Sequence, residues 1–202
     1  MHRVGILLAA CLAVSNASAA GTSERNDVPF PSQAFGAKFG MGVADFEAAC
    51  KRAGGTATKD TQSGFSAVRR CSVALGAAPS LPTPAWMQAH FCGGAACMFS
   101  VTWYGKTAAN VAEIEQTFLT KYGAATTRGL THENLARRCA DPANSNAPSL
   151  RDASWFFVDG TPKRNPVGHI SIDASCGRSG IMVGALFIDE PALAALVAEQ
   201  NF

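Results

Sequence analysis

Six cysteines between residues 50 and 176 constrain the fold of this chain more than any other feature. They are Cys50, Cys71, Cys92, Cys97, Cys139 and Cys176, and a seventh, Cys11, lies in the N-terminal stretch. An even number of cysteines in an oxidising compartment is typical of disulfide bonds. Six cysteines allow fifteen pairings, and the sequence alone does not choose among them. Of these we favour the pairing of neighbours, Cys50–Cys71, Cys92–Cys97 and Cys139–Cys176.

The N-terminus predicts export. Arg3 is followed by an apolar run over Val4–Val14 and an A-x-A motif that ends at Ala19, which is the pattern of a cleaved signal peptide. We expect cleavage after Ala19, a flexible leader over residues 20–33 and a periplasmic or secreted protein. An alternative is that Cys11, which ends the lipobox-like sequence LAAC, carries a lipid anchor. The apolar run is too short for a membrane span, which needs roughly 20 residues.

The closest pair of cysteines fits a β-hairpin. If Gly94 and Ala95 form a two-residue turn, Cys92 faces Cys97 with the Cα atoms about 4.5 Å apart. A disulfide spans that distance, and because the closed loop is so short this bond should stabilise the fold least of the three. His90 with the same two cysteines could also bind zinc, but the sequence lacks a second pair of ligands at similar spacing. We therefore expect neither a metal nor a cofactor.

Hydrophobic patterning predicts an α+β fold, with antiparallel sheet or sheets packed by two to three helices. Strand-like runs follow one another directly, which favours antiparallel pairing. The expected helices cover residues 43–53 and 110–122 and begin again at Pro191, and the strands cover 65–75, 97–103, 154–159, 168–174 and 180–188. The last strand is apolar on both faces and should be central. One domain over residues 34–202 is expected, and an alternative description divides it into two helix-plus-strands repeats, 34–105 and 106–202.

Charge and composition restrict the partners. The formal net charge is +2 and 48% of the residues are hydrophobic, so the chain can bury a core. Its basic residues do not gather into a stripe, and we therefore do not expect nucleic-acid binding. Exposed loops concentrate binding, so the candidate surfaces are residues 77–84 and the expected hairpin loop 159–168. The candidate binding residues in the second loop are Thr161, Lys163, Arg164 and Asn165.

One set of residues raises the possibility of catalysis. His169, Ser171 and Asp173 alternate along one strand and carry the side-chain types of a hydrolase triad. Same-face neighbours on a strand lie about 6.6 Å apart, beyond direct hydrogen-bond reach. A polar outer face explains the three residues more simply, and no catalytic residue is assigned.

Two stretches carry a resemblance to a known family. FGAKFGMGVADFEAACKRAGG (residues 35–55) and FSVTWYG followed by VAEIEQTFLTKYG (residues 99–123) are similar to small exported bacterial domains. In those domains a Gly-Met turn leads into a short helix and an antiparallel sheet. The chain thus resembles the beta-lactamase-inhibitor-protein-like domains that also occur in outer-membrane assembly lipoproteins. The cysteines and the segment 124–152 depart from that pattern. The resemblance implies a binding role and leaves the partner open.

These observations favour an exported, non-catalytic binding protein. It would act through protein–protein contacts as an inhibitor, an immunity protein or an envelope accessory, and its partner would be another exported or envelope protein. A small secreted hydrolase using His169 is one alternative. A structural envelope lipoprotein anchored at Cys11 is the other.

Overall fold

The structure is a computed structural model that describes residues 28–62, 64–76, 81–125, 127–128, 132–140, 150–161, 163–177 and 180–200. The expected signal peptide, the lipobox at Cys11, most of the expected leader and residues 77–80 of the first candidate loop lie outside the described residues. Among the helices of the described ranges, none is both long and apolar enough to cross a membrane.

Eight strands form one antiparallel sheet, in the order β3-β4-β5-β6-β10-β9-β8-β7, and two short strands pair separately. The strands are β1 (Gln33–Ala34), β2 (Ala37–Lys38), β3 (Ala57–Asp60), β4 (Ala67–Cys71), β5 (Trp86–Cys92), β6 (Ala95–Lys106), β7 (Thr127–Arg128), β8 (Leu150–Val158), β9 (Pro166–Gly177) and β10 (Gly180–Ile188). The helices are α1 (Val43–Arg52), α2 (Ala108–Tyr122), α3 (His132–Cys139) and α4 (Glu190–Gln200). The expected α+β class is confirmed, with four helices in the described part of the chain where two to three were expected.

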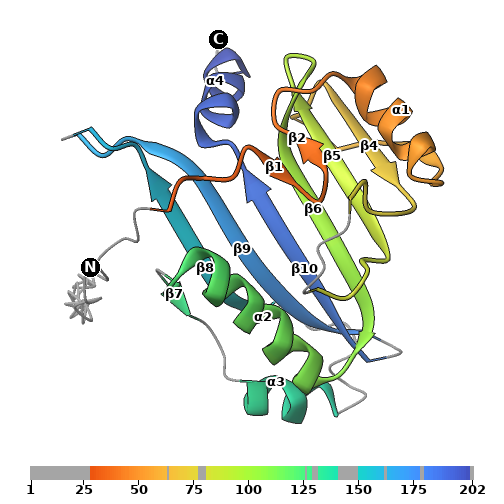
Figure 1. Ribbon diagram of the computed structural model, residues 1–202, viewed down its shortest axis with the longest axis vertical. Helices are drawn as coiled ribbons and strands as arrows, with labels where there is room; N and C mark the ends of the chain where they lie inside the picture. The colour runs from red at the N-terminus through yellow and green to blue at the C-terminus, as the bar shows by residue number, and fades with distance from the viewer. Residues whose placement is uncertain are drawn as a thin grey trace, which may run out of the picture.

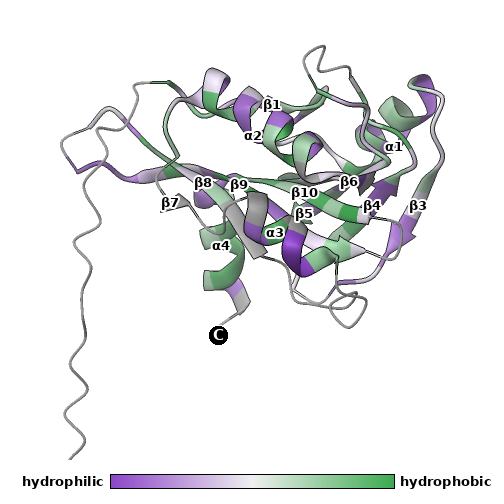
Figure 2. Cartoon of the chain, turned by 90° about the horizontal axis from the view of Figure 1, so that it is seen from below, coloured by the Kyte–Doolittle hydropathy of each residue, from purple (hydrophilic) through white to green (hydrophobic). Residues whose placement is uncertain are grey.

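The helices divide unequally between the two faces of the sheet (Figures 1 and 2). Helices α1 and α2, together with the β1–β2 pair, cover one face, and the main hydrophobic core lies beneath them. Phe46 of α1 and Ile114 of α2 are fully buried in that core, and the Phe46 ring packs against that of Phe91 on β5. Helix α4 lies on the opposite face and projects away from one end of it. Of the helices that the structure describes, only α4 lies on this second face, at one end, and we call it the open face.

Chain order and sheet order split the fold into two halves. Strands β3 to β6 follow α1, strands β7 to β10 follow α2, and the halves meet where β6 pairs with β10. Strand β10 thus lies at the centre of the sheet, as its two apolar faces predict. That the halves are sequence repeats remains a prediction.

The three disulfides join the cysteines that are neighbours in sequence, as expected. Cys50–Cys71 ties α1 to β4, Cys92–Cys97 links β5 to β6, and Cys139–Cys176 ties α3 to β9. Each disulfide therefore either fixes a helix against the sheet or closes a hairpin.

The β5–β6 hairpin has a different turn from the one the sequence suggested. Gly93 and Gly94 occupy the turn with φ of 59° and 90°, which matches a type I′ turn, and Cys92 pairs with Ala95. Cys97 is the extra residue of a β-bulge, because its neighbours on β6 pair with consecutive residues of β5. The bulge turns Cys97 away from the main core, where simple alternation had placed it, and the Cα atoms of the disulfide lie 5.7 Å apart.

The folded domain also begins earlier than residue 34. Phe30, expected in a flexible leader, packs with ring centroids 5.1 Å from Phe39 and 5.5 Å from Phe157. A Cβ atom at Gly168 would lie 2.2 Å from the Phe30 ring, so the absent side chain at that glycine makes room for it. Phe30 therefore packs against the core although it falls within the expected leader.

Arg69 is the one charged residue on the core-facing side of β4, where the alternating pattern calls for an apolar side chain. Its Nε donates a hydrogen bond to Oε1 of Glu47 on α1, and its Nη1 donates to the carbonyl of Val68 at 3.0 Å. The pairing explains the exception, since Arg69 joins the sheet to the helix above it.

Candidate functional site

The structure separates the residues of the possible hydrolase triad. Ser171 is fully buried, and its Oγ makes no hydrogen bond among the residues that the structure describes. His169 is 7% exposed, stacks on Phe156 with ring centroids 4.3 Å apart, and has its Nδ1 4.0 Å from Oε1 of Glu190. No serine–histidine pair is thus formed, and water and substrate have no access to the hydroxyl that would be the nucleophile.

The candidate binding loop lies between β8 and β9, with Thr161, Lys163, Arg164 and Asn165 all exposed. Asp159 organises it. Its Oδ1 accepts hydrogen bonds from the hydroxyl of Thr161 at 2.6 Å and the amide of Asn165 at 3.0 Å, and its Oδ2 accepts from Nδ2 of Asn165 at 2.8 Å. The hydrogen bonds from Thr161 and then Asn165 hold the pKa of Asp159 below its ordinary value. The loop is accordingly ordered around one carboxylate.

The most extended candidate surface is the open face itself. The strand register places Trp86 of β5, Thr102 of β6, Gly184 of β10 and Asp173 of β9 in one row across four strands. Because side chains alternate along a strand, all four positions face away from the main core. At Gly184 the row has no side chain, and a hollow of about 210 Å³ opens there.

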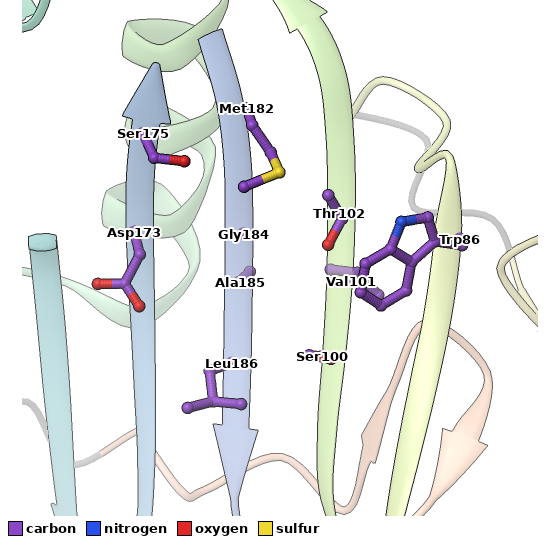
Figure 3. A pocket seen from close by; sticks show the side chains of 10 residues that line it. All are labelled: Trp86, Ser100, Val101, Thr102, Asp173, Ser175, Met182, Gly184, Ala185 and Leu186. Atoms are coloured by element: carbon purple, nitrogen blue, oxygen red, sulfur yellow. The ribbon is translucent and has the colours of Figure 1, made fainter. Parts of the chain in front are cut away.

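Side chains border this hollow on four sides (Figure 3). Trp86 stands on one side, Asp173 and Ser175 on the other, and Met182 and Leu186 close the two ends along β10. The remaining lining is formed by Ser100, Val101, Thr102, Gly184 and Ala185. The hollow is thus apolar at its ends and on its indole side, with a carboxylate and hydroxyl groups near it.

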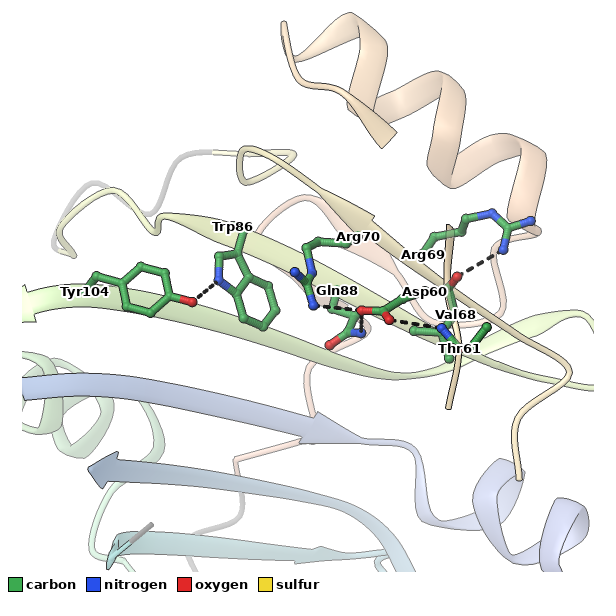
Figure 4. Close-up of polar contacts among 8 residues, drawn as sticks. All are labelled: Asp60, Thr61, Val68, Arg69, Arg70, Trp86, Gln88 and Tyr104. Atoms are coloured by element: carbon green, nitrogen blue, oxygen red, sulfur yellow. Dashed lines mark hydrogen bonds and ion pairs between the residues drawn. The ribbon is translucent and has the colours of Figure 1, made fainter. Parts of the chain in front are cut away.

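A chain of polar contacts holds Trp86 in place (Figure 4). Its Nε1 donates a hydrogen bond to the Tyr104 hydroxyl at 2.9 Å, and the Arg70 guanidinium lies 4.7 Å from the centroid of its ring. Asp60 in turn accepts hydrogen bonds from Arg70 at 2.7 Å and from Gln88 at 3.0 Å. Exposed ion pairs contribute little stability, so the main effect of this chain is to orient the indole beside the hollow.

The other two tryptophans serve the core. Trp103 and Trp155 are buried, and their Nε1 atoms donate to the carbonyls of Pro82 and Gly123 at 2.8 and 2.9 Å. Tyr104, by contrast, is 51% exposed on the open face. Trp86 and Tyr104 are therefore the aromatic side chains that this part of the face offers to a partner.

His90, the zinc candidate, belongs to a second small core on the open-face side. Cys97, Met98 and Ile188 form this cluster with the first turn of α4. The His90 ring packs on Phe65 with centroids 4.8 Å apart, and burial lowers its pKa to about 4 although the charge of Asp60 acts in the opposite direction. Within the described ranges no three His, Cys, Asp or Glu side chains gather as a metal site would need.

Comparisons with protein-family models, with curated proteins and with solved structures give no significant match. The functional argument therefore rests on the geometry of the chain. Sequence reasoning missed the hollow, although one signal was present: a glycine inside an apolar central strand often marks a position where another group approaches closely.

Proposed function

We propose that this protein is an exported, non-catalytic binding protein and that it recognises another exported or envelope protein through the open face of its sheet. The observation that carries the proposal is the hollowed row at Gly184, with Trp86 and Tyr104 beside it on the face where, among the described helices, α4 covers only one end. Such a cluster of oriented aromatic side chains around a depression is typical of the energetic centre of a protein interface.

The scaffold supports a binding role. Two disulfides fix α1 and α3 to the sheet, and an antiparallel sheet presents side chains at fixed spacing. A rigid surface loses little conformational entropy when a partner docks, which favours affinity. Inhibitor, immunity and envelope-accessory roles are all compatible with this mode of binding, and the resemblance to beta-lactamase-inhibitor-protein-like domains supports it.

The ordered loop after β8 adds a second contact region to the proposal. Lys163 and Arg164 are exposed there, and Asp159 fixes the backbone around them. In this proposal the loop contributes charge at the periphery of the interface, where it affects the rate of association more than the final affinity.

Site-specific photo-crosslinking tests the proposal. A photoreactive phenylalanine analogue is placed at Tyr104 on the open face or, as a matched control, at Glu113, which is exposed on the outer side of α2. In extracts of the source cell we expect a defined adduct from position 104 and none of the same mass from position 113. Absence of an adduct at 104, or the same adduct at both positions, would contradict recognition by the open face.

A further inference from the structure

We infer that the hollow at Gly184 is a pocket for one uncharged aromatic side chain, phenylalanine or tyrosine, of the protein partner. The inference rests on the proposed function and specifies the chemistry that its central contact takes. It rests on the size of the hollow, on the residues that border it and on the open space that the absent side chain of Gly184 leaves.

Size selects a single side chain. Pockets for drug-sized ligands and cofactors occupy roughly 300–1,000 Å³, and the hollow of about 210 Å³ falls below that range. One ring with its methylene group fills such a space.

The lining selects an aromatic group. The Trp86 indole borders the hollow on one side and the thioether of Met182 closes one end, while Leu186 closes the other. Aromatic pairs and sulfur–aromatic contacts are each favourable beyond the burial of area. A phenyl or phenol ring makes both contacts at once, whereas an aliphatic side chain makes neither.

The lining of the hollow, which is mainly carbon, favours an uncharged occupant. Arg70 is paired with Asp60, and the carboxylate of Asp173 borders one side only. The hydroxyls of Ser100 and Ser175 can hydrogen-bond a phenol oxygen. A lysine side chain would instead bring an ammonium group into a space bordered mainly by carbon, with a desolvation cost.

Gly184 maintains the space and provides the test. A Cβ atom there would meet only two carbonyl oxygens, of Asp173 at 3.9 Å and of Val101 at 4.0 Å. Larger side chains are therefore tolerated by the backbone and fill the hollow rather than distort the sheet. Gly160, whose Cβ would meet nothing within 4 Å, is the matched control for the same substitution outside the hollow.

Two-dimensional amide NMR with side-chain analogues tests the inference on the purified full chain. The probes are p-cresol for an aromatic side chain and n-butylammonium for lysine. We expect p-cresol at millimolar concentration to shift the amides of residues 100–102, 173–175 and 182–186, and n-butylammonium to bind at least tenfold more weakly. Gly184→Leu should weaken p-cresol binding at least tenfold and Gly160→Leu should leave it unchanged, with the thermal midpoints of both variants showing that they fold.

Three results would overturn the inference: no p-cresol shifts at these amides, equal or tighter binding of n-butylammonium, or unchanged p-cresol binding in folded Gly184→Leu. If Gly184→Leu does not fold, Gly184→Ala, which adds a single carbon atom with room around it, replaces it with an expected two- to fivefold weakening. The photo-crosslink from position 104 distinguishes a failure of this inference from a failure of the proposed function. An adduct without p-cresol binding leaves the binding role and removes the aromatic pocket, and the reverse outcome removes the binding role.

Discussion

Acid should destabilise the protein through His90. The side chain is 3% exposed, Phe65 packs against its ring, and Nδ1 has no hydrogen-bond partner among the residues that the structure describes. The folded state thus holds the imidazole neutral with a pKa of about 4, whereas the unfolded chain has the ordinary value of 6.5. Below pH 6.5 the unfolded state binds a proton that the folded state does not, so the free energy of unfolding falls as the pH falls.

The size of the effect follows from the two pKa values. Each pKa unit corresponds to about 1.4 kcal/mol, so His90 accounts for a loss of about 3 kcal/mol, in order of magnitude, between pH 6.5 and pH 4. No discount for solvent screening is needed because the ring is buried. Carboxylates that titrate in the same pH range also change the free energy of unfolding with pH. The measurement therefore needs a reference chain that lacks only His90.

His90→Leu supplies that reference. It replaces the imidazole with an apolar side chain, removes a buried polar atom that lacks a partner among the described residues, and should change stability at pH 7 by less than about 1 kcal/mol. Urea unfolding with the disulfides intact, at pH steps from 7.5 to 4, should show the native chain losing about 3 kcal/mol more than the variant. If the free energy of unfolding fell equally with pH in the two chains, the argument would be refuted. That result would mean that His90 is protonated as easily in the folded state as in the unfolded chain.

Further predictions concern stability at neutral pH. Gly168→Ala should cost about 1–3 kcal/mol in urea unfolding because its Cβ would overlap the Phe30 ring, whereas Gly184→Ala, with open space, should cost less than about 0.5 kcal/mol; equal costs would contradict the packing of Phe30. A double-mutant cycle of Arg69→Gln and Glu47→Gln should give a coupling of about 1 kcal/mol, reduced by the exposure of the glutamate, and zero coupling would show that the pair does not join helix and sheet. Replacing the disulfide of the β5–β6 hairpin by two serines should cost about 2 kcal/mol against about 4 kcal/mol for the one between α3 and β9, because the sequence separations are 5 and 37; a reversed order would contradict the loop-entropy argument.

Local rules predicted much of the fold. The helix over residues 43–52 follows from the spacing of Phe46 and Cys50, and the central place of β10 follows from its apolar faces. The cysteine pairs follow from the preference for neighbours. The second helix, expected over residues 110–122, starts at Ala108. The helix begins two residues earlier than expected because Thr107 is the cap and forms a capping box with Asn110.

Features that depend on distant contacts were not predicted. Phe30 reads as part of a polar leader until Gly168, far along the chain, makes room for its ring. The bulge at Cys97 depends on the pairing of β5 with β6 and has no local signal. The hollow arises only when β6, β10 and β9 align Thr102, Gly184 and Asp173 in one row. Register across a sheet is a tertiary property, and the candidate site depends on it.

The central claim is tested most directly by measuring how tightly the partner captured at position 104 binds three purified chains. These are the native chain, Trp86→Ala and Glu113→Ala. Trp86→Ala removes the indole beside the hollow, and Glu113→Ala alters the outer side of α2. Recognition by the open face predicts at least a tenfold higher Kd for Trp86→Ala, as expected for an aromatic side chain at the centre of an interface, and an unchanged Kd for Glu113→Ala. Equal Kd values for the native chain and folded Trp86→Ala, or a loss of affinity with Glu113→Ala alone, would contradict it.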